Sequence, residues 1–312
     1  MPDRRPARPR RTGSGTAARP GASRSTTLPV GPVPIDTGWV ELVPDRGDPR
    51  SITVMVNGVP SSPVHLDDPG RLDFEYLQQM AVLVEALTPA GGPLDAVHLG
   101  AAGCALPRWL EATRPGSRQL GVDIDAALLT LVRTWFDLPR SPRLRLRAGD
   151  AREVLAALPT ASADVVVRDV FAGDRTPRSL TTAGFTAQVA RVLRPGGLYL
   201  ANCADRPPLA LARAEAATVR SVLGEVALVV EPGMLRGRRY GNVVVAGLTV
   251  PARGLTDAAL ARALRSLPVP VRLLQGAELD AFVGGAVVLS DPGGGPDAPQ
   301  QEGGDPAGTT TR

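Results

Sequence analysis

Four acidic residues stand directly after apolar stretches of this 312-residue chain, and their positions suit the binding of a nucleoside and an amine. If the stretches are parallel strands, their carboxyl ends meet at one edge of a sheet, where ligands bind. A carboxylate there can accept hydrogen bonds from ribose hydroxyls or an adenine amino group. Any one such acid is more simply a helix N-cap or a solvated loop residue. The four acids are Asp123, Asp150, Asp169 and Asp205.

The segment from Asp95 to Asp125 is typical of a nucleoside-binding unit. A short apolar run leads into a turn with Gly100 and Gly103, then a helix-like pattern, then a second apolar run that ends at Asp123. Glycines in such a turn let a ligand approach the main chain, and the later acid binds ribose hydroxyls. Because the turn lacks the full G-x-G-x-x-G pattern, an α/β domain with an ordinary tight turn stays an alternative.

Asp169 has the surroundings best suited to a general base. It lies near the end of the apolar run 164–170 and precedes a long loop that also carries Asp174. We expect its carboxylate to be partly desolvated, so that it can hold a cationic amine and remove its proton. Asp150 follows Gly149 and is expected to hydrogen-bond an adenine amino group.

The alternation of strand and helix patterns predicts an α/β fold with a doubly wound, mostly parallel, seven-stranded sheet. A small β-hairpin with a turn at Asn57-Gly58 and a helix over Asp67–Leu87 precede it. A turn is expected at residues 194–197, and Val271–Leu274 and Ala286–Leu289 are candidate late strands. The predicted divisions are a disordered Arg/Pro-rich tail (1–34), the hairpin and helix (35–90), the nucleoside-binding core (91–250), a helix and strand extension (251–290) and a disordered tail (291–312).

Composition argues against several classes of protein. Residues 35–290 hold 27 Arg and 26 acidic residues, a net charge of +1, so the folded part gives no electrostatic reason to expect nucleic acid as a partner. No apolar run approaches the roughly 20 residues of a membrane span. Cys104 and Cys203 have no partner at metal-ligand spacing, so we expect a cytoplasmic protein without a metal or a required disulfide. His98 is expected to be a core residue, and His65 an isolated loop residue.

The order of these motifs resembles the spermidine synthase (polyamine aminopropyltransferase) family, which has the class I methyltransferase-like Rossmann fold. The resemblance covers roughly residues 39–250 and includes the glycine turn, D-I-D, G-D, D-x(4)-D-R-T-P, R-P-G-G and the earlier segment D-F-E-Y. It implies that Asp123 binds ribose, that Asp150 contacts adenine and that Asp169 activates the attacking amine. Tyr76 would line the amine side, and Asp174 would stand for the second acid of the family's D-x-x-D motif. It also implies a small-molecule amine acceptor and a homo-oligomer, either a homodimer or a tetramer.

The sequence departs from the family at the donor end of the site. Arg108 fixes the register, and Gly103 then replaces the aspartate that holds the amino group of the aminopropyl donor. Such a loss removes a charge-assisted hydrogen bond of about 1.5–3 kcal/mol and also the repulsion of a donor carboxylate. Leu77 replaces a polar residue. The arginines of Gly233–Arg239, Arg236, Arg238 and Arg239, suit an anionic partner better than a polyamine.

Three interpretations follow from the resemblance. The first is aminopropyl transfer from decarboxylated S-adenosylmethionine to putrescine. The second is methyl transfer to a small molecule from intact S-adenosylmethionine, which Gly103 would permit. The third is a family member that binds a nucleoside or a partner protein without catalysis, which the retained acids make less attractive.

Overall fold

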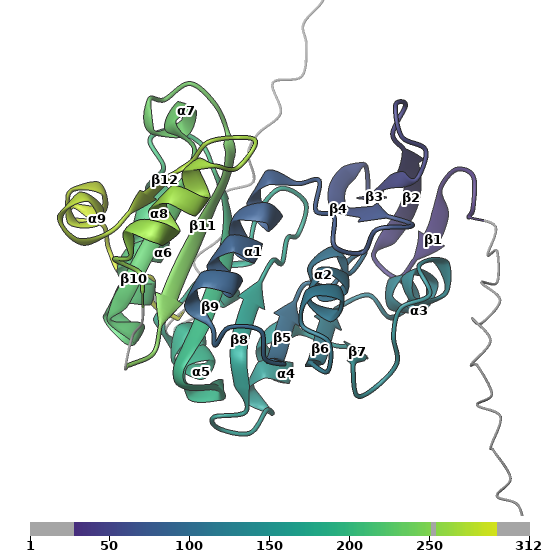
Figure 1. The fold of residues 1–312 in the computed structure, drawn as a ribbon, viewed down its shortest axis with the longest axis horizontal. Coiled ribbons are helices and arrows are strands. Elements are labelled where there is room, and N and C mark those ends of the chain that lie inside the picture. Colours follow the sequence, from purple (N-terminus) through teal and green to yellow (C-terminus); the bar gives the residue numbers. More distant parts are fainter. Residues whose placement is uncertain (1–27, 251–253, 292–312) are drawn as a thin grey trace, which may run out of the picture.

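The computed structural model describes residues 28–250 and 254–291, and its centre is an eight-stranded sheet with helices on both faces (Figure 1). The strand order is β12-β10-β11-β9-β8-β5-β6-β7. Strands β5 to β9 run parallel, and β10, β11 and β12 are antiparallel to their neighbours. The strands are β5 (Asp95–Leu99), β6 (Arg118–Asp123), β7 (Leu144–Ala148), β8 (Ala163–Arg168), β9 (Leu193–Asp205), β10 (Glu225–Val230), β11 (Gly241–Leu248) and β12 (Arg272–Leu274).

This arrangement confirms the predicted α/β fold and mostly parallel sheet. The sheet has one strand more than the predicted seven, because β12, which lies within the candidate late strand Val271–Leu274, pairs with β10. The central strands are apolar on both faces: Val166 packs into one core, and Val165 and Val167 pack into the other. A parallel strand that is buried on both faces needs such a continuous apolar run.

The helices form two layers, one on each face of the sheet. The core on one face contains residues of α1 (Glu75–Leu87), α2 (Ala105–Thr113) and α8 (Ala258–Arg265). The core on the other face contains residues of α4 (Ala151–Ala156), α5 (Ala183–Val192), α6 (Ala210–Leu223) and α9 (Gly276–Val283). In Figure 1, α1 and α2 lie in front of the sheet. The remaining helices are α3 (Ala126–Trp135), the 3-10 turn η1 (Arg178–Leu180) and α7 (Pro232–Leu235).

A separate four-stranded antiparallel sheet precedes the central one, where the sequence had predicted only a hairpin. Its strands, in the order β1-β2-β3-β4, are β1 (Val33–Ile35), β2 (Gly38–Pro44), β3 (Ser51–Val56) and β4 (Val59–His65). The buried side chains Val40 and Val54 form a third core with Leu128 of α3 and with Cys104 of the glycine turn. The small sheet therefore packs directly against the predicted nucleoside-binding unit.

Several predicted boundaries were wrong. Helix α1 begins at Glu75 and not at Asp67, because Pro69-Gly70 cannot continue a helix. Strand β9 includes the predicted turn at 194–197, with Gly196 at φ +76°. Ala286–Leu289 is not a strand. Residues 28–34 of the tail that is predicted to be disordered are described, and they include the start of strand β1. Residues 1–27 and 292–312 lie outside the described residues.

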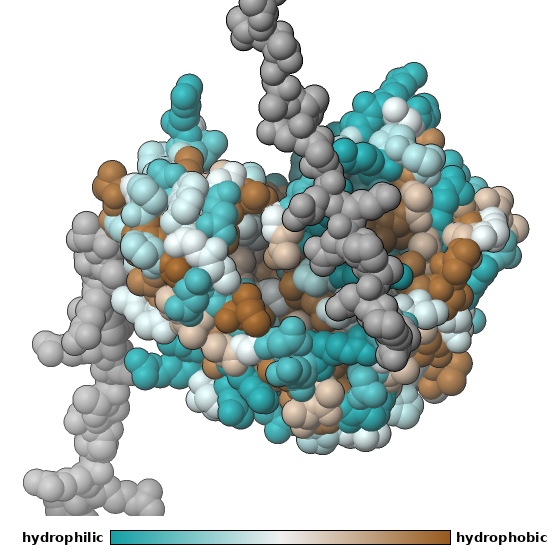
Figure 2. Space-filling view, turned by 180° about the vertical axis from the view of Figure 1, so that it is seen from behind, coloured by the Kyte–Doolittle hydropathy of each residue, from teal (hydrophilic) through white to brown (hydrophobic). Residues whose placement is uncertain are grey.

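The described part of the chain contains no helix that is long and apolar enough to span a membrane. On the face shown in Figure 2, hydrophobic residues form small spots among hydrophilic ones.

Candidate active site

Asp169 lies at the carboxyl end of β8, and neighbouring elements hold both of its carboxylate oxygens. The Tyr76 hydroxyl of α1 donates to Oδ2 at 2.8 Å, and Asn202 Nδ2 of β9 donates to Oδ1 at 2.9 Å. Burial raises the pKa of Asp169, and the two hydrogen bonds and Arg168 oppose that shift. Burial and the nearby Asp169 charge raise the pKa of Tyr76 well above its ordinary value, so Tyr76 keeps its proton and donates. Asp169 is thus a desolvated carboxylate with neutral hydrogen-bond donors.

The backbone around Asp169 depends on Gly100. Gly100 has φ +86°, and a Cβ there would lie 2.0 Å from the carbonyl oxygen of Asp169. The ends of β5 and β8 can therefore approach closely only with glycine at this position. The Asp169 N–H donates to the carbonyl of Leu99 at 2.8 Å, which extends the strand pairing to the catalytic candidate.

A buried ion pair lies directly before Asp169 in the chain. The Arg168 side chain is 0% exposed and pairs with Glu215 of α6, which is 3% exposed. The Arg168 guanidinium also donates to the backbone carbonyls of Asn202 at 3.0 Å and Leu180 at 3.3 Å. Because Asn202 holds Asp169, the pair fixes β8, β9 and the loop after Asp169 relative to one another.

Asp123 ends β6 and faces the glycine turn. Its Oδ2 accepts the backbone N–H groups of Ala101 and Ala102, both at 3.1 Å, and its Oδ1 accepts that of Asp125 at 3.1 Å. Burial raises the pKa of Asp123, and these backbone donors oppose the shift. The next residue, Ile124, is 61% exposed although it is large and apolar. This edge therefore offers an acid beside a free apolar surface, which suits a ribose and a base.

The small sheet forms part of the wall at the glycine turn. A Cβ on Gly103 would lie 2.9 Å from Cβ of Ser62 and 3.0 Å from Cγ2 of Val54. The space that a longer side chain would need at position 103 is thus already filled by β3 and β4. Asp125, the N-cap of α3, also accepts both the N–H and the hydroxyl of Thr37 in the β1–β2 turn.

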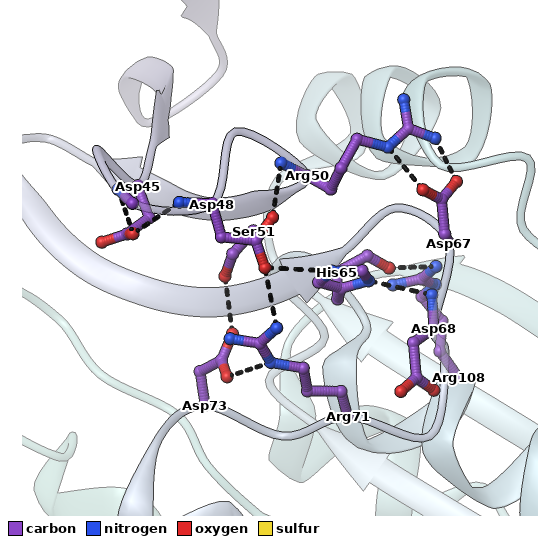
Figure 3. Close-up of polar contacts among 11 residues, drawn as sticks. Asp45, Asp48, Arg50, Ser51, His65, Asp67, Asp68, Arg71, Asp73 and Arg108 are labelled. Atoms are coloured by element: carbon purple, nitrogen blue, oxygen red, sulfur yellow. Dashed lines mark hydrogen bonds and ion pairs between the residues drawn. The ribbon is translucent and has the colours of Figure 1, made fainter.

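A polar network fixes the far end of β4 to α2 (Figure 3). Arg108 of α2 donates to the carbonyl of His65 at 3.0 Å. His65 Nδ1 accepts the N–H of Asp68 at 2.9 Å, and its Nε2 lies 3.3 Å from Asp48. Arg71 pairs with Asp48 in turn. His65 ends β4 and belongs to this network, so the prediction of an isolated loop residue was wrong.

His98 of β5 is buried, as predicted, but it also lines a cavity. Gln119 donates its Nε2 to the carbonyl of Pro107, so its Oε1 faces the imidazole at 3.0 Å and His98 donates from Nε2. Burial lowers the pKa of His98 to about 4, which keeps the ring neutral. Its Nδ1 is then a bare acceptor, and it has no partner among the described residues.

Asp169, Tyr76 and His98 line one cavity at the carboxyl edge of the sheet, which we call the first cavity. Asp123 is not part of its wall, but it bonds to Ala101 and Ala102, which are. The space in it that a water molecule can reach is about 30 Å³, so it has room for one or two waters. A substrate therefore needs the edge to open or must bind along its rim. Its wall includes Ser62, Tyr76, His98, Gly100, Ala102 and Asp169.

Two predicted site residues lie elsewhere. Asp150 is exposed and is the N-cap of α4, with its Oδ1 accepting the N–H groups of Arg152 and Glu153. Asp174 is exposed and lines a second cavity, with Arg175 and Arg206 at 3.9 and 3.8 Å. The contact of Asp150 with adenine stays a prediction, and Asp174 does not join Asp169 in the wall of the first cavity.

Similarity to a solved structure shows which family the chain belongs to. The crystal structure of a probable spermidine synthase from Corynebacterium glutamicum is 35% identical, with a TM-score of 0.80, over 88% of this chain and 100% of that one. The chain belongs to the spermidine synthase-like family. Its core also matches a family model described as a methyltransferase domain, over residues 97–201.

Curated relatives of the family are transferases. Polyamine aminopropyltransferase of Neisseria meningitidis is 25% identical over 174 residues, which is 54% of this chain and 64% of that protein. The match thus spans less than two thirds of that relative. The eEF1A lysine and N-terminal methyltransferase of Danio rerio is 26% identical over 132 residues, 39% of this chain and 19% of that protein. Both types of transferase are therefore represented among proteins similar to this chain.

The sequence analysis did not predict three polar residues around Asp169. These are Asn202, which donates to Asp169, and the buried ion pair of Arg168 with Glu215. Asn202 ends an apolar run and carries no local signal of its partner 33 residues away. Arg168 did carry a signal, since a charged residue inside an otherwise apolar strand must find a buried partner.

Proposed function

We propose that this chain transfers an alkyl group, aminopropyl or methyl, from a sulfonium donor of the S-adenosylmethionine type to an amine. The observation that carries the proposal is the pairing of a desolvated Asp169 with Tyr76 and Asn202 beside the bare turn at Gly100. The family and its transferase members support a nucleoside-containing donor at this edge, with Asp123 for the ribose and Ile124 for the base.

The reaction requires no covalent bond between the protein and a substrate. The amine nitrogen attacks the carbon beside the sulfonium, the C–N bond forms, and the C–S pair of electrons returns to sulfur as a neutral thioether. The amine must lose a proton, and we assign the role of accepting it to Asp169. Tyr76 and Asn202 orient its two oxygens, and the remaining contribution is the positioning of the two substrates.

Aminopropyl transfer to a polyamine such as putrescine is the first candidate, since it is the activity named for the curated relative and for the solved relative of the family. Methyl transfer from intact S-adenosylmethionine is the second, and a specific observation favours it. The wall at Gly103 carries no carboxylate and has Ser62 and Val54 in its place. A donor carboxylate would meet no like charge there.

Calorimetry with the two donors side by side separates the candidates. Tighter binding of the decarboxylated donor, followed by product formation with putrescine, supports aminopropyl transfer. Tighter binding of intact S-adenosylmethionine overturns it in favour of methyl transfer. If the folded protein binds neither donor, both candidates fail and a non-catalytic role is left.

A further inference from the structure

A second cavity opens at the same edge of the sheet, and its lining is unlike that of the first. The space in it that a water molecule can reach is about 380 Å³, which is within the range of small-molecule sites. It is bounded by the loop after Asp169, by the end of β9 and by the residue before β11. Its lining includes Arg175, Arg178, Arg206, Thr176, Tyr240 and Leu211.

The lining holds three arginines and two acidic residues, Asp174 and Asp205. Arg178 makes no side-chain hydrogen bond or ion pair within residues 28–250 and 254–291. Asp174 approaches Arg175 and Arg206 at 3.9 and 3.8 Å, which is beyond hydrogen-bond distance. The cations are therefore available to a ligand.

The second acid of the lining, Asp205, accepts hydrogen bonds from the backbone. Its two oxygens accept the N–H groups of Arg206 and of Ala212 in α6. Only Oδ2 bonds to α6, and no arginine side chain pairs with Asp205 among residues 28–250 and 254–291. The acids thus reduce the positive charge of the cavity without blocking its donors.

Two further observations concern the polar lining. Thr176 lines the cavity, and its hydroxyl oxygen, which is buried from water, has no hydrogen-bond partner among the described residues. Buried polar atoms usually find a partner, so this hydroxyl is a polar group that remains to be satisfied. The Arg206 guanidinium lies 5.9 Å from the ring centroid of Tyr240, and both residues line the cavity.

We propose that the second cavity binds a small organic anion, a phosphate or a carboxylate, through Arg175, Arg178 and Arg206. Guanidinium groups bind both kinds of anion through paired N–H donors. Leu211 and the Tyr240 ring would cover the apolar part of the ligand. This inference does not depend on the proposed function, because it concerns different residues and requires no donor.

Calorimetry of the full chain at low ionic strength, with inorganic phosphate and with citrate, tests the proposal and separates the two sources of anion. We expect saturable binding of at least one anion. The double variant Arg178→Gln/Arg206→Gln should weaken it at least about tenfold, as expected for the loss of charge-assisted hydrogen bonds.

The matched control is Arg262→Gln/Arg265→Gln, which removes two exposed arginines from α8 and should leave anion binding unchanged. No saturable binding of either anion, or an equal loss in the two double variants, overturns the proposal. Donor binding is measured in the same variants. Its retention in Arg178→Gln/Arg206→Gln shows an intact fold and keeps a failure here distinct from a failure of the proposed transferase activity.

Discussion

The two cavities lie at the same edge of the same sheet, but the charged residues of their linings differ. The first has about 30 Å³ of space for water, a neutral imidazole and an acid held by two neutral donors. The second has about 380 Å³ and arginines with weak partners. Asp169 and Asp174 are five residues apart, but only Asp169 is desolvated. Both residues are aspartates, so it is burial that makes the carboxylate of Asp169, and not that of Asp174, suited to act as a base.

The largest expected effect separates these two acids. Asp169→Asn should lower turnover by roughly 10²–10⁴-fold, because a general base contributes about that much, and it should spare donor binding. Asp174→Asn, the control, should change turnover only slightly. Steady-state kinetics and calorimetry measure both. Equal losses in the two variants would remove the distinction between the cavities.

The Asp169→Asn variant also has a stability consequence with a definite sign. The pKa of Asp169 is raised in the folded state, so the ionised carboxylate opposes folding as pH rises through that pKa. A neutral amide lacks this cost. We therefore expect the free energy of unfolding at neutral pH to be unchanged or higher in the variant.

A second prediction compares a buried arginine with an exposed one. Arg168→Met leaves Glu215 buried without its partner and should cost about 3–5 kcal/mol of unfolding free energy, measured by urea denaturation. Arg206→Met in the second cavity should cost little, since its side chain is 70% exposed. The double variant Arg168→Met/Glu215→Leu should recover most of the loss. If it is as unstable as the single variant, the lost packing and not the orphaned charge is responsible.

A third prediction adds a charge at the glycine turn beside the first cavity. Gly103→Asp must displace Ser62 and Val54, so we expect a loss of about 1–3 kcal/mol in unfolding free energy. The additional change Ser62→Gly should relieve part of it. A stable Gly103→Asp protein that binds the decarboxylated donor more tightly would show that β3 and β4 yield easily at this position.

The smallest expected effect is a shift along the pH axis. Turnover should rise with pH as Asp169 ionises, through a pKa above the usual aspartate range. The hydrogen bond from Asn202 favours the ionised form, so Asn202→Ala should move this acidic limb upward by about one pH unit. The pH profile of kcat/KM measures it. A limb that moves to lower pH would contradict the assigned role of Asn202.

Local sequence pattern was sufficient for the fold and for part of the site. Apolar runs, glycines and strand-end acids are local features, and they predicted the sheet, the turn at Gly100 and the positions of Asp123 and Asp169. The same patterns could not say what each acid touches. Asp150 follows its strand like the others, but the structure uses it as a helix cap.

The tertiary structure decided everything that depends on distant partners. Tyr76 lies 93 residues and Asn202 33 residues from Asp169, and neither distance is visible in periodicity. The resemblance of the sequence to its family indicated that Gly103 replaces an aspartate, but only the packing of β3 and β4 revealed what fills its place. The physical reason is that strand and helix patterns report which face of an element is buried, whereas solvation and hydrogen-bond partners arise only when elements from different parts of the chain meet.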